Sequence, residues 1–171
     1  MRVIDFRLRP PFGAFAGLIV FRDAERTARL AKELGFDLAP SVRARSMALL
    51  LQEMDSIGCR CGVVTGRTGT VFGSVDNRVI EEVVAAHPGR FVGAAYVAPH
   101  DRKAARAEID RAMQAGFRAV VMEPGLAQPP WHMDDARLYP IYERLEGANV
   151  PLVFMAGGNA GPDLAYSSPE H

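Results

Sequence analysis

The chain has 171 residues, of which 49% are hydrophobic and 23% charged, and its formal net charge is zero. This composition is typical of a soluble globular protein with a buried core, and we predict a single domain over residues 1–171. The neutral balance gives no electrostatic basis for binding nucleic acid. No apolar run reaches the ~18 residues that a membrane-spanning helix needs, so we expect no membrane partner.

Two further features bear on the cellular compartment. The N-terminus lacks the uninterrupted apolar stretch of a signal peptide, because Asp5, Arg7 and Arg9 are charged. Cys59 and Cys61 stand too close for a mutual disulfide and have no second cysteine pair, which favours two structural thiols over a metal site. We therefore expect a cytoplasmic protein.

Short apolar runs along the chain predict strands, and helical patterns fill the intervals between them. The predicted strands are Val3–Leu8, Arg60–Thr65, Phe91–Val97, Phe117–Met122 and Pro151–Met155.

Capping residues mark where the intervening helices begin. Asp23 is placed to cap a helix after the first strand, and Ser41 is placed to cap a second helix in the same interval. Asp76 and Asp101 are placed to cap the next two helices, and Pro140 suits the first turn of the last one. Apolar residues in these segments recur at the i, i+3, i+4 spacing of an amphipathic helix.

Strands that alternate with helices predict an α/β fold with a parallel sheet. From the second strand onward each unit takes roughly 30 residues, and a closed (β/α)8 barrel takes about 250 in all. We therefore predict the first five βα units of a TIM-type barrel, with extra helices after the first strand. The alternative is a five-stranded flavodoxin-like domain, although Pro10 and Pro11 stand where its phosphate-binding loop would be.

The first predicted strand carries an unusual set of charges. Side chains alternate along a strand, so Asp5, Arg7 and Arg9 are expected on one face of an otherwise apolar, buried strand. The strand ends at Pro10, which places the arginines at its carboxyl end, where parallel α/β proteins bind ligands. Arg7 and Arg9 either bind an anionic substrate or pair internally with Asp5 or Glu123; we favour the anion.

Three more polar residues follow predicted strands at the same end of the sheet. Glu123, directly after the fourth strand, suits proton transfer or pairing with an arginine. Arg67, in a glycine-containing loop after the second strand, is either a third cation at the site or a solvated charge. His100, after the third strand, is either an acid–base group or a surface residue. Trp131 and His132 form either a lid or, as we favour, a packed rim.

Several motifs occur in a set order along nearly the whole chain. They are Val3–Arg9, His87–Gly93, Gly116–Val121, Asp134-Asp135 with Leu138–Tyr142, and Val150–Phe154. This ordered set resembles the amidohydrolase-related (β/α)8 barrels, a group of metal-dependent hydrolases, lactonases and aromatic-acid decarboxylases. The resemblance implies the barrel fold.

Three positions depart from that family's pattern. The resemblance places the two metal-binding histidines of strand one at Arg7 and Arg9, and the histidine of strand five at Met155. A guanidinium has no lone pair to give a metal, and a thioether prefers soft metals to Zn²⁺ or Mn²⁺. The resemblance therefore implies that the usual metal site is lost, and we expect no metal or other cofactor.

The resemblance also implies an activity. We expect an enzyme that hydrolyses a lactone or amide-like bond of a small carboxylated substrate, or decarboxylates it. Arg7, Arg9 and Arg67 would bind the anion, and Glu123 or His100 would transfer the proton. The alternative is a non-catalytic binding or scaffold protein of the same fold.

The first and fifth strands would both be open edges of such a five-stranded piece. Open apolar edges pair readily with other strands. We therefore expect the 171-residue chain to belong to a longer barrel or to form a homo-oligomer, and not to be an active enzyme by itself.

Overall fold

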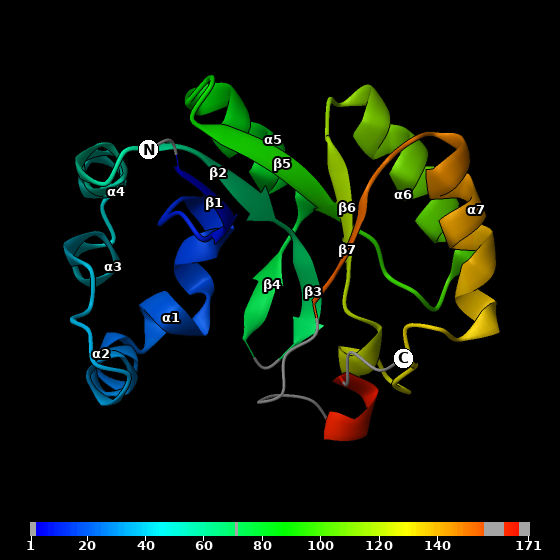
Figure 1. Ribbon diagram of the computed structural model, residues 1–171, viewed down its shortest axis with the longest axis horizontal. Helices are drawn as coiled ribbons and strands as arrows, with labels where there is room; N and C mark the ends of the chain where they lie inside the picture. The colour runs from blue at the N-terminus through cyan, green and yellow to red at the C-terminus, as the bar shows by residue number, and fades with distance from the viewer. Residues whose placement is uncertain (1–2, 71, 156–162, 168–171) are drawn as a thin grey trace.

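A five-stranded sheet forms the centre of the computed structural model, which describes residues 3–70, 72–155 and 163–167 (Figure 1). All neighbouring strands are parallel, and their order in the sheet follows their order in the chain. The strands are β1 (Val3–Leu8), β2 (Cys59–Thr65), β5 (Phe91–Tyr96), β6 (Ala119–Met122) and β7 (Leu152–Phe154).

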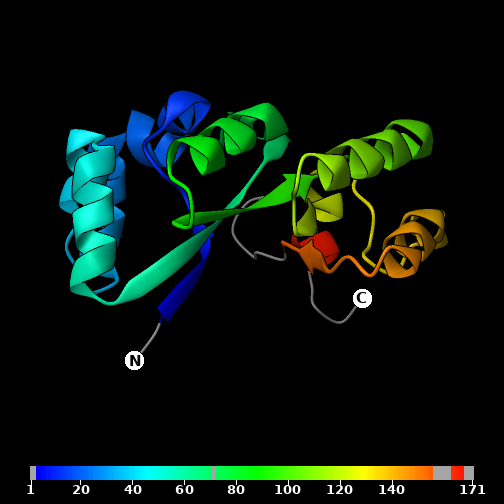
Figure 2. The same cartoon turned by 90° about the horizontal axis from the view of Figure 1, so that it is seen from above.

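Helices cover the convex side of the sheet, which curls into a half-barrel (Figure 2). The interval after β1 holds a short 3-10 segment, Gly13–Gly17, and the helices α1 (Ile19–Arg22), α2 (Ala24–Glu33), α3 (Pro40–Ala44) and α4 (Met47–Ser56). The later helices are α5 (Asn77–Ala86), α6 (Arg102–Gln114) and α7 (Tyr139–Gly147). Within the described residues, no helix is both long enough and apolar enough to cross a bilayer.

The two faces of the sheet are packed differently. The convex face packs against helices in two clusters, one around α4 and α5 and the other around α6 and α7. Among the described residues, a third apolar cluster lies on the concave face and consists of strand residues and the residue after β7: Val63, Ala94, Ala119, Val121, Val153 and Met155. A sheet that is apolar on both faces, with helices on one side, is the arrangement of a TIM barrel, so the predicted partial barrel is confirmed.

Three predicted helix starts are confirmed by their capping bonds. The carboxylates of Asp23, Asp76 and Asp101 accept hydrogen bonds from backbone N–H groups of the first turns of α2, α5 and α6. The predicted cap at Ser41 is wrong. Ser41 lies inside the short helix α3, and Ser46 caps α4 instead, because Arg45 adopts a left-handed conformation that ends α3.

A β-hairpin stands where the sequence predicts a glycine-containing loop. Its strands are β3 (Arg67–Thr70) and β4 (Gly73–Val75), which pair antiparallel with each other, apart from the main sheet. The hairpin packs on the 3-10 segment before α1, and the N–H of Ile19 donates to the carbonyl of Phe72. The prediction failed because this stretch lacks the apolar alternation of a strand.

The first strand is less buried than the sequence predicts. Ile4 and Phe6 are 63% and 57% exposed, because β1 lies at the edge of the sheet and has β2 as its single neighbour in the described sheet. The pairing also shifts, since Asp5 aligns with Gly62 and Leu8 with Val64, three residues against two. Regular alternation therefore does not run from Asp5 to Leu8, and Asp5 accepts a hydrogen bond from the backbone N–H of Arg7.

Candidate functional site

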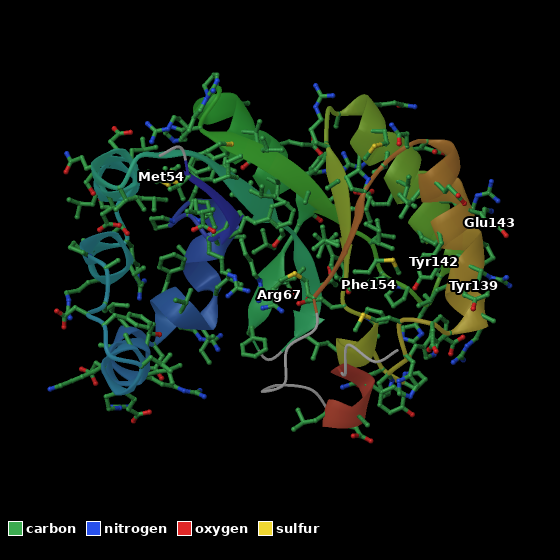
Figure 3. The ribbon with its side chains drawn as sticks, viewed as in Figure 1. Met54, Arg67, Tyr139, Tyr142, Glu143 and Phe154 are labelled. Atoms are coloured by element: carbon green, nitrogen blue, oxygen red, sulfur yellow. The ribbon has the colours of Figure 1, made fainter. Side chains whose placement is uncertain are left out.

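A buried ion pair joins two strand ends at the carboxyl end of the sheet. Arg67 begins β3, one residue after β2 ends, and Glu123 directly follows β6. The guanidinium donates from Nη2 to Oε1 at 2.5 Å and from Nε to Oε2 at 3.3 Å. Arg67 and Glu123 are only 5% and 2% exposed, so the expectation of a solvated Arg67 loop charge is wrong. Figure 3 shows Arg67 near the middle of the molecule, over the hairpin.

The local chain explains why this pair is held in place. The ring of Phe72 lies 4.9 Å from the Arg67 guanidinium, which adds a cation–π contact. Glu123 is followed by Pro124, which starts a 3-10 turn (Pro124–Leu126), and the N–H of Leu126 donates to the Glu123 carbonyl. The two hydrogen bonds between Arg67 and Glu123 compensate both buried charges. This pairing matters for stability, because an unpaired charge at this depth would cost several kcal/mol.

Arg7 and Arg9 lie beside this pair, and neither has an acidic partner among the described residues. Burial lowers the pKa of Arg7, with the charge of Arg67 next, and Glu123 opposes both effects. Burial also lowers the pKa of Arg9 to about 10, helped by the charges of Arg7 and Arg67. Within the described part of the chain, no carboxylate forms an ion pair with either residue.

These charges leave a positive excess at the site. Three guanidiniums and the one carboxylate of Glu123 interact electrostatically, which leaves an excess of two positive charges. Internal pairing of Arg7 or Arg9 with Asp5 or Glu123 does not occur, because Asp5 bonds to backbone and Glu123 is taken by Arg67. The arrangement is therefore suited to an anionic ligand.

Tyr96 is a site residue that the sequence analysis missed. It ends β5 and lies two residues beyond Ala94, which faces the concave side. Burial raises the pKa of Tyr96 to about 12, with the charge of Glu123 adding to the effect and Arg67 opposing it. The hydroxyl therefore stays protonated at neutral pH and remains a hydrogen-bond donor. The sequence pattern that could have identified Tyr96 is its position two residues after Ala94 near the end of a predicted strand, which places both side chains on the same face.

His100 does not join the charged cluster. Its ring lies edge-on to Trp131, with ring centroids 4.2 Å apart, and the residue is exposed. None of the hydrogen bonds and ion pairs seen among the described residues links His100 to the arginines or Glu123. Trp131 is buried against α6 and α7, as rim packing predicts, and Arg137 stacks on it at 3.9 Å. His132 stacks on Tyr166.

Arg7, Arg9 and Met155, where the resemblance places metal ligands, have side chains that do not suit a divalent metal ion. Arg7 and Arg9 offer no lone pair, and Met155 packs with the apolar concave face. No group of three or more His, Cys, Asp or Glu residues within residues 3–70, 72–155 and 163–167 is placed to hold a metal. The structure thus brings together Arg7, Arg9, Arg67 and Glu123 of the five predicted site residues.

Solved structures similar to this chain are barrels of greater length. An uncharacterised TIM-barrel protein of Bordetella bronchiseptica is 39% identical, with a TM-score of 0.91; the match covers 100% of this chain and 61% of that one. The 2,6-dihydroxybenzoate decarboxylase of Rhizobium is 19% identical, with a TM-score of 0.61, over 95% of this chain and 52% of that one. The second similarity shows a shared fold alone.

Comparison with protein families gives a more direct answer. Comparison with curated proteins found no match. The amidohydrolase family model, in contrast, matches residues 4–171, which is nearly the whole chain. This match agrees with the ordered motifs and with the observed half-barrel. The chain therefore belongs to the amidohydrolase family.

Proposed function

We propose that this protein binds a small carboxylated substrate at Arg7 and Arg9 and either hydrolyses a lactone or amide-like bond in it or decarboxylates it. The observation that carries the proposal is that Arg7 and Arg9 form no ion pair with any acid in the described part of the chain, beside the buried Arg67–Glu123 pair. Arg9 is half-buried and Arg7 is exposed, and two neighbouring cations of this kind repel each other unless a ligand compensates their charge.

Each residue of the cluster has a role in this proposal. The forks of Arg7 and Arg9 match a carboxylate bidentately. Both candidate reactions develop negative charge, on carbon in decarboxylation and on oxygen when water adds to a lactone or amide carbonyl. Arg67, held in orientation by Glu123, and the protonated hydroxyl of Tyr96 would stabilise that charge. We assign proton transfer to Glu123 before His100, because Glu123 lies within the cluster.

The proposal includes no metal ion. The argument is the donor chemistry at Arg7, Arg9 and Met155, which offers no set of hard ligands. Elemental analysis of the purified protein is expected to find no stoichiometric Zn²⁺, Mn²⁺ or Fe²⁺. About one equivalent of metal that competes with carboxylate binding would contradict this part of the proposal.

A carboxylated aromatic is the first ligand to try. The barrel that this chain resembles in Rhizobium is a 2,6-dihydroxybenzoate decarboxylase, and a related structure holds 2,6-dihydroxybenzoate. Titration calorimetry with benzoate and 2,6-dihydroxybenzoate would measure binding, and carbon dioxide release and lactone hydrolysis would measure turnover. Since the chain spans 61% of the Bordetella protein, each assay also needs a chain of that protein's length.

The decisive variants remove one arginine at a time. Arg9→Ala is expected to weaken carboxylate binding by roughly 2–5 kcal/mol, because the charge is desolvated. Arg29→Ala removes an exposed arginine of α2 and should leave the affinity unchanged. An affinity that is the same in Arg9→Ala and in the unaltered protein would overturn the proposal.

A non-catalytic binding protein is the second candidate, and one observation favours it. Both oxygens of Glu123 already accept hydrogen bonds from Arg67, so this carboxylate is engaged within the protein's own structure. Carboxylate binding that depends on Arg9, without turnover of any aromatic acid or lactone, would identify this second function.

A further inference from the structure

The Asn77 side chain forms more hydrogen bonds than the first residue of a helix needs. It opens α5 and is only 8% exposed. Its Nδ2 donates to the carbonyl of Tyr96 at 2.9 Å, and its Oδ1 accepts from the backbone N–H of Tyr96 at 2.8 Å. The same Nδ2 also donates to Oε1 of Glu108 on α6 at 2.7 Å. One carboxamide therefore joins β5, α5 and α6.

The two bonds to Tyr96 replace a missing stretch of sheet. In the pairing of β2 with β5, Gly62 lies opposite Phe91 and Thr65 lies opposite Ala94. The last hydrogen bond of this pairing is donated by the N–H of Gly66 to the Ala94 carbonyl. Beyond Gly66 the chain turns away into the hairpin. A continuing parallel strand would supply one acceptor and one donor to Tyr96. The Asn77 side chain supplies both, so β5 stays paired to its last residue.

The same carboxamide also lies close to Gly66, at the base of the hairpin. A Cβ atom at Gly66 would lie 2.5 Å from Asn77 Oδ1, 3.0 Å from Tyr96 Cβ and 3.1 Å from the Val75 carbonyl oxygen. Glycine is therefore required there, and the residue that follows it is Arg67. Asn77 thus contacts the backbone at Gly66, the residue before Arg67, and the backbone of Tyr96.

Glu108 fixes which way the amide points. Arg111 donates to both oxygens of Glu108 and also donates to Glu81, so the pKa of Glu108 is lowered and the group remains a carboxylate. A flipped Asn77 would set its carbonyl oxygen against this carboxylate and against the Tyr96 carbonyl. Acceptors facing acceptors are unfavourable, so a single amide orientation remains.

We propose that Asn77 is a positioning residue for the anion site: its carboxamide takes the place of a β2 peptide group and holds Arg67 and Tyr96 in register with Glu123. Asn77 itself touches none of the charged groups of the site, and it acts through Gly66 and Tyr96. This inference rests on the proposed function, because the site that Asn77 positions is the proposed carboxylate site.

The test compares three variants of the full chain at a temperature well below unfolding. Asn77→Ala removes the carboxamide, and Asn77→Asp keeps its shape and one acceptor but loses its donor. Ser41→Ala is the matched control, since Ser41 is also a buried polar residue and its hydroxyl donates to Glu53 at 2.5 Å in the helical layer after β1. All three should lose stability, whereas only the two Asn77 variants should weaken benzoate binding, by roughly tenfold or more.

A second readout needs no ligand. The Nε–H of Arg67 donates to Glu123, so its NMR signal should exchange slowly with water in the unaltered protein and in Ser41→Ala. In both Asn77 variants this exchange should accelerate. Adding Glu108→Gln to Asn77→Asp supplies a new amide donor toward the introduced carboxylate, and this should recover part of both effects.

The outcomes separate the inference from the proposed function. Unchanged benzoate affinity and unchanged Arg67 exchange in Asn77→Asp would overturn the role of Asn77, even if benzoate binds and Arg9→Ala abolishes binding. Failure of the unaltered protein to bind any carboxylate would instead overturn the proposed function. In that case the Arg67 exchange still decides whether Asn77 positions the ion pair.

Discussion

Arg67, which stands at the carboxyl end of β2, and Arg7 and Arg9, at the β1 edge of the sheet, differ in what neutralises their charge. Arg67 lies between β2, β5 and β6, and the chain itself supplies Glu123 as its partner. Arg7 lies on β1 and Arg9 directly follows it; this strand has one neighbour in the described sheet, and no described acid pairs with either arginine. The central charge is thus part of the protein's own structure, and the edge charges are available to a ligand.

The strongest test of this comparison removes the central acid. Glu123→Gln leaves the Arg67 guanidinium buried without a counter-charge, and this should lower the free energy of unfolding by about 3–5 kcal/mol. Urea unfolding at neutral pH would measure it. Asp110→Asn is the control, because Asp110 pairs with Arg144 nearer the surface and should cost no more than about 1 kcal/mol. Equal losses in the two variants would contradict the claim that the central pair is special.

A second test disturbs the backbone that carries Arg67. Gly66→Ala places a methyl group against Asn77 and Tyr96 and should destabilise the protein by roughly 1–3 kcal/mol, with local loss of the hairpin's packing. Gly147→Ala is the matched control, since nothing lies within 4 Å of an added Cβ near the end of α7. That substitution should stabilise by about 0.5–1 kcal/mol. Thermal unfolding of the two variants would reveal the opposite signs.

The sequence predicted the central sheet better than the site that stands on it. Strand β1 was predicted at its observed bounds, and three aspartate caps were correct, because these signals are local in the chain. The partner of Arg67 could not be predicted with certainty, since Glu123 is 56 residues away and only the curl of the sheet brings the two together. The exposure of Ile4 and Phe6 was missed although the first strand was predicted at an edge, because an apolar run indicates burial and does not show which of its side chains lack a covering element.

A third test uses pH at the edge of the sheet. A cation whose pKa is lower in the folded state than in the unfolded state destabilises the fold while it is charged. This penalty fades as the pH rises through the folded-state pKa, because the folded protein then loses the proton first. Arg9 falls in this class, because burial lowers its pKa from the ordinary range to about 10.

Arg9→Met should therefore be more stable than the unaltered protein at pH 8, by an amount on the order of 1 kcal/mol. The gap should narrow as the pH is raised from 9 to about 11. Urea unfolding of both proteins across this range would measure the difference, in which titration of the other groups cancels. A gap that stays constant with pH, or a less stable variant, would show that Arg9 has a partner in solution.

The smallest expected effect on stability concerns the exposed side chains of β1. Ile4→Lys and Phe6→Lys should change the free energy of unfolding by no more than about 0.5 kcal/mol, since both side chains already face solvent.

The effect of these two substitutions on self-association should be much larger. An edge strand with exposed apolar side chains pairs readily with another strand, and lysine discourages such pairing. Light scattering over a concentration series should show self-association of the unaltered chain and less of it in either variant.

The matched control is Leu34→Lys, which introduces the same charge at an exposed apolar position at the end of α2. Equal loss of association in this control would show that general hydrophobicity, and not the β1 edge, drives assembly. A concentration-independent monomer would remove the self-association prediction and leave Arg7 and Arg9 open to small ligands alone.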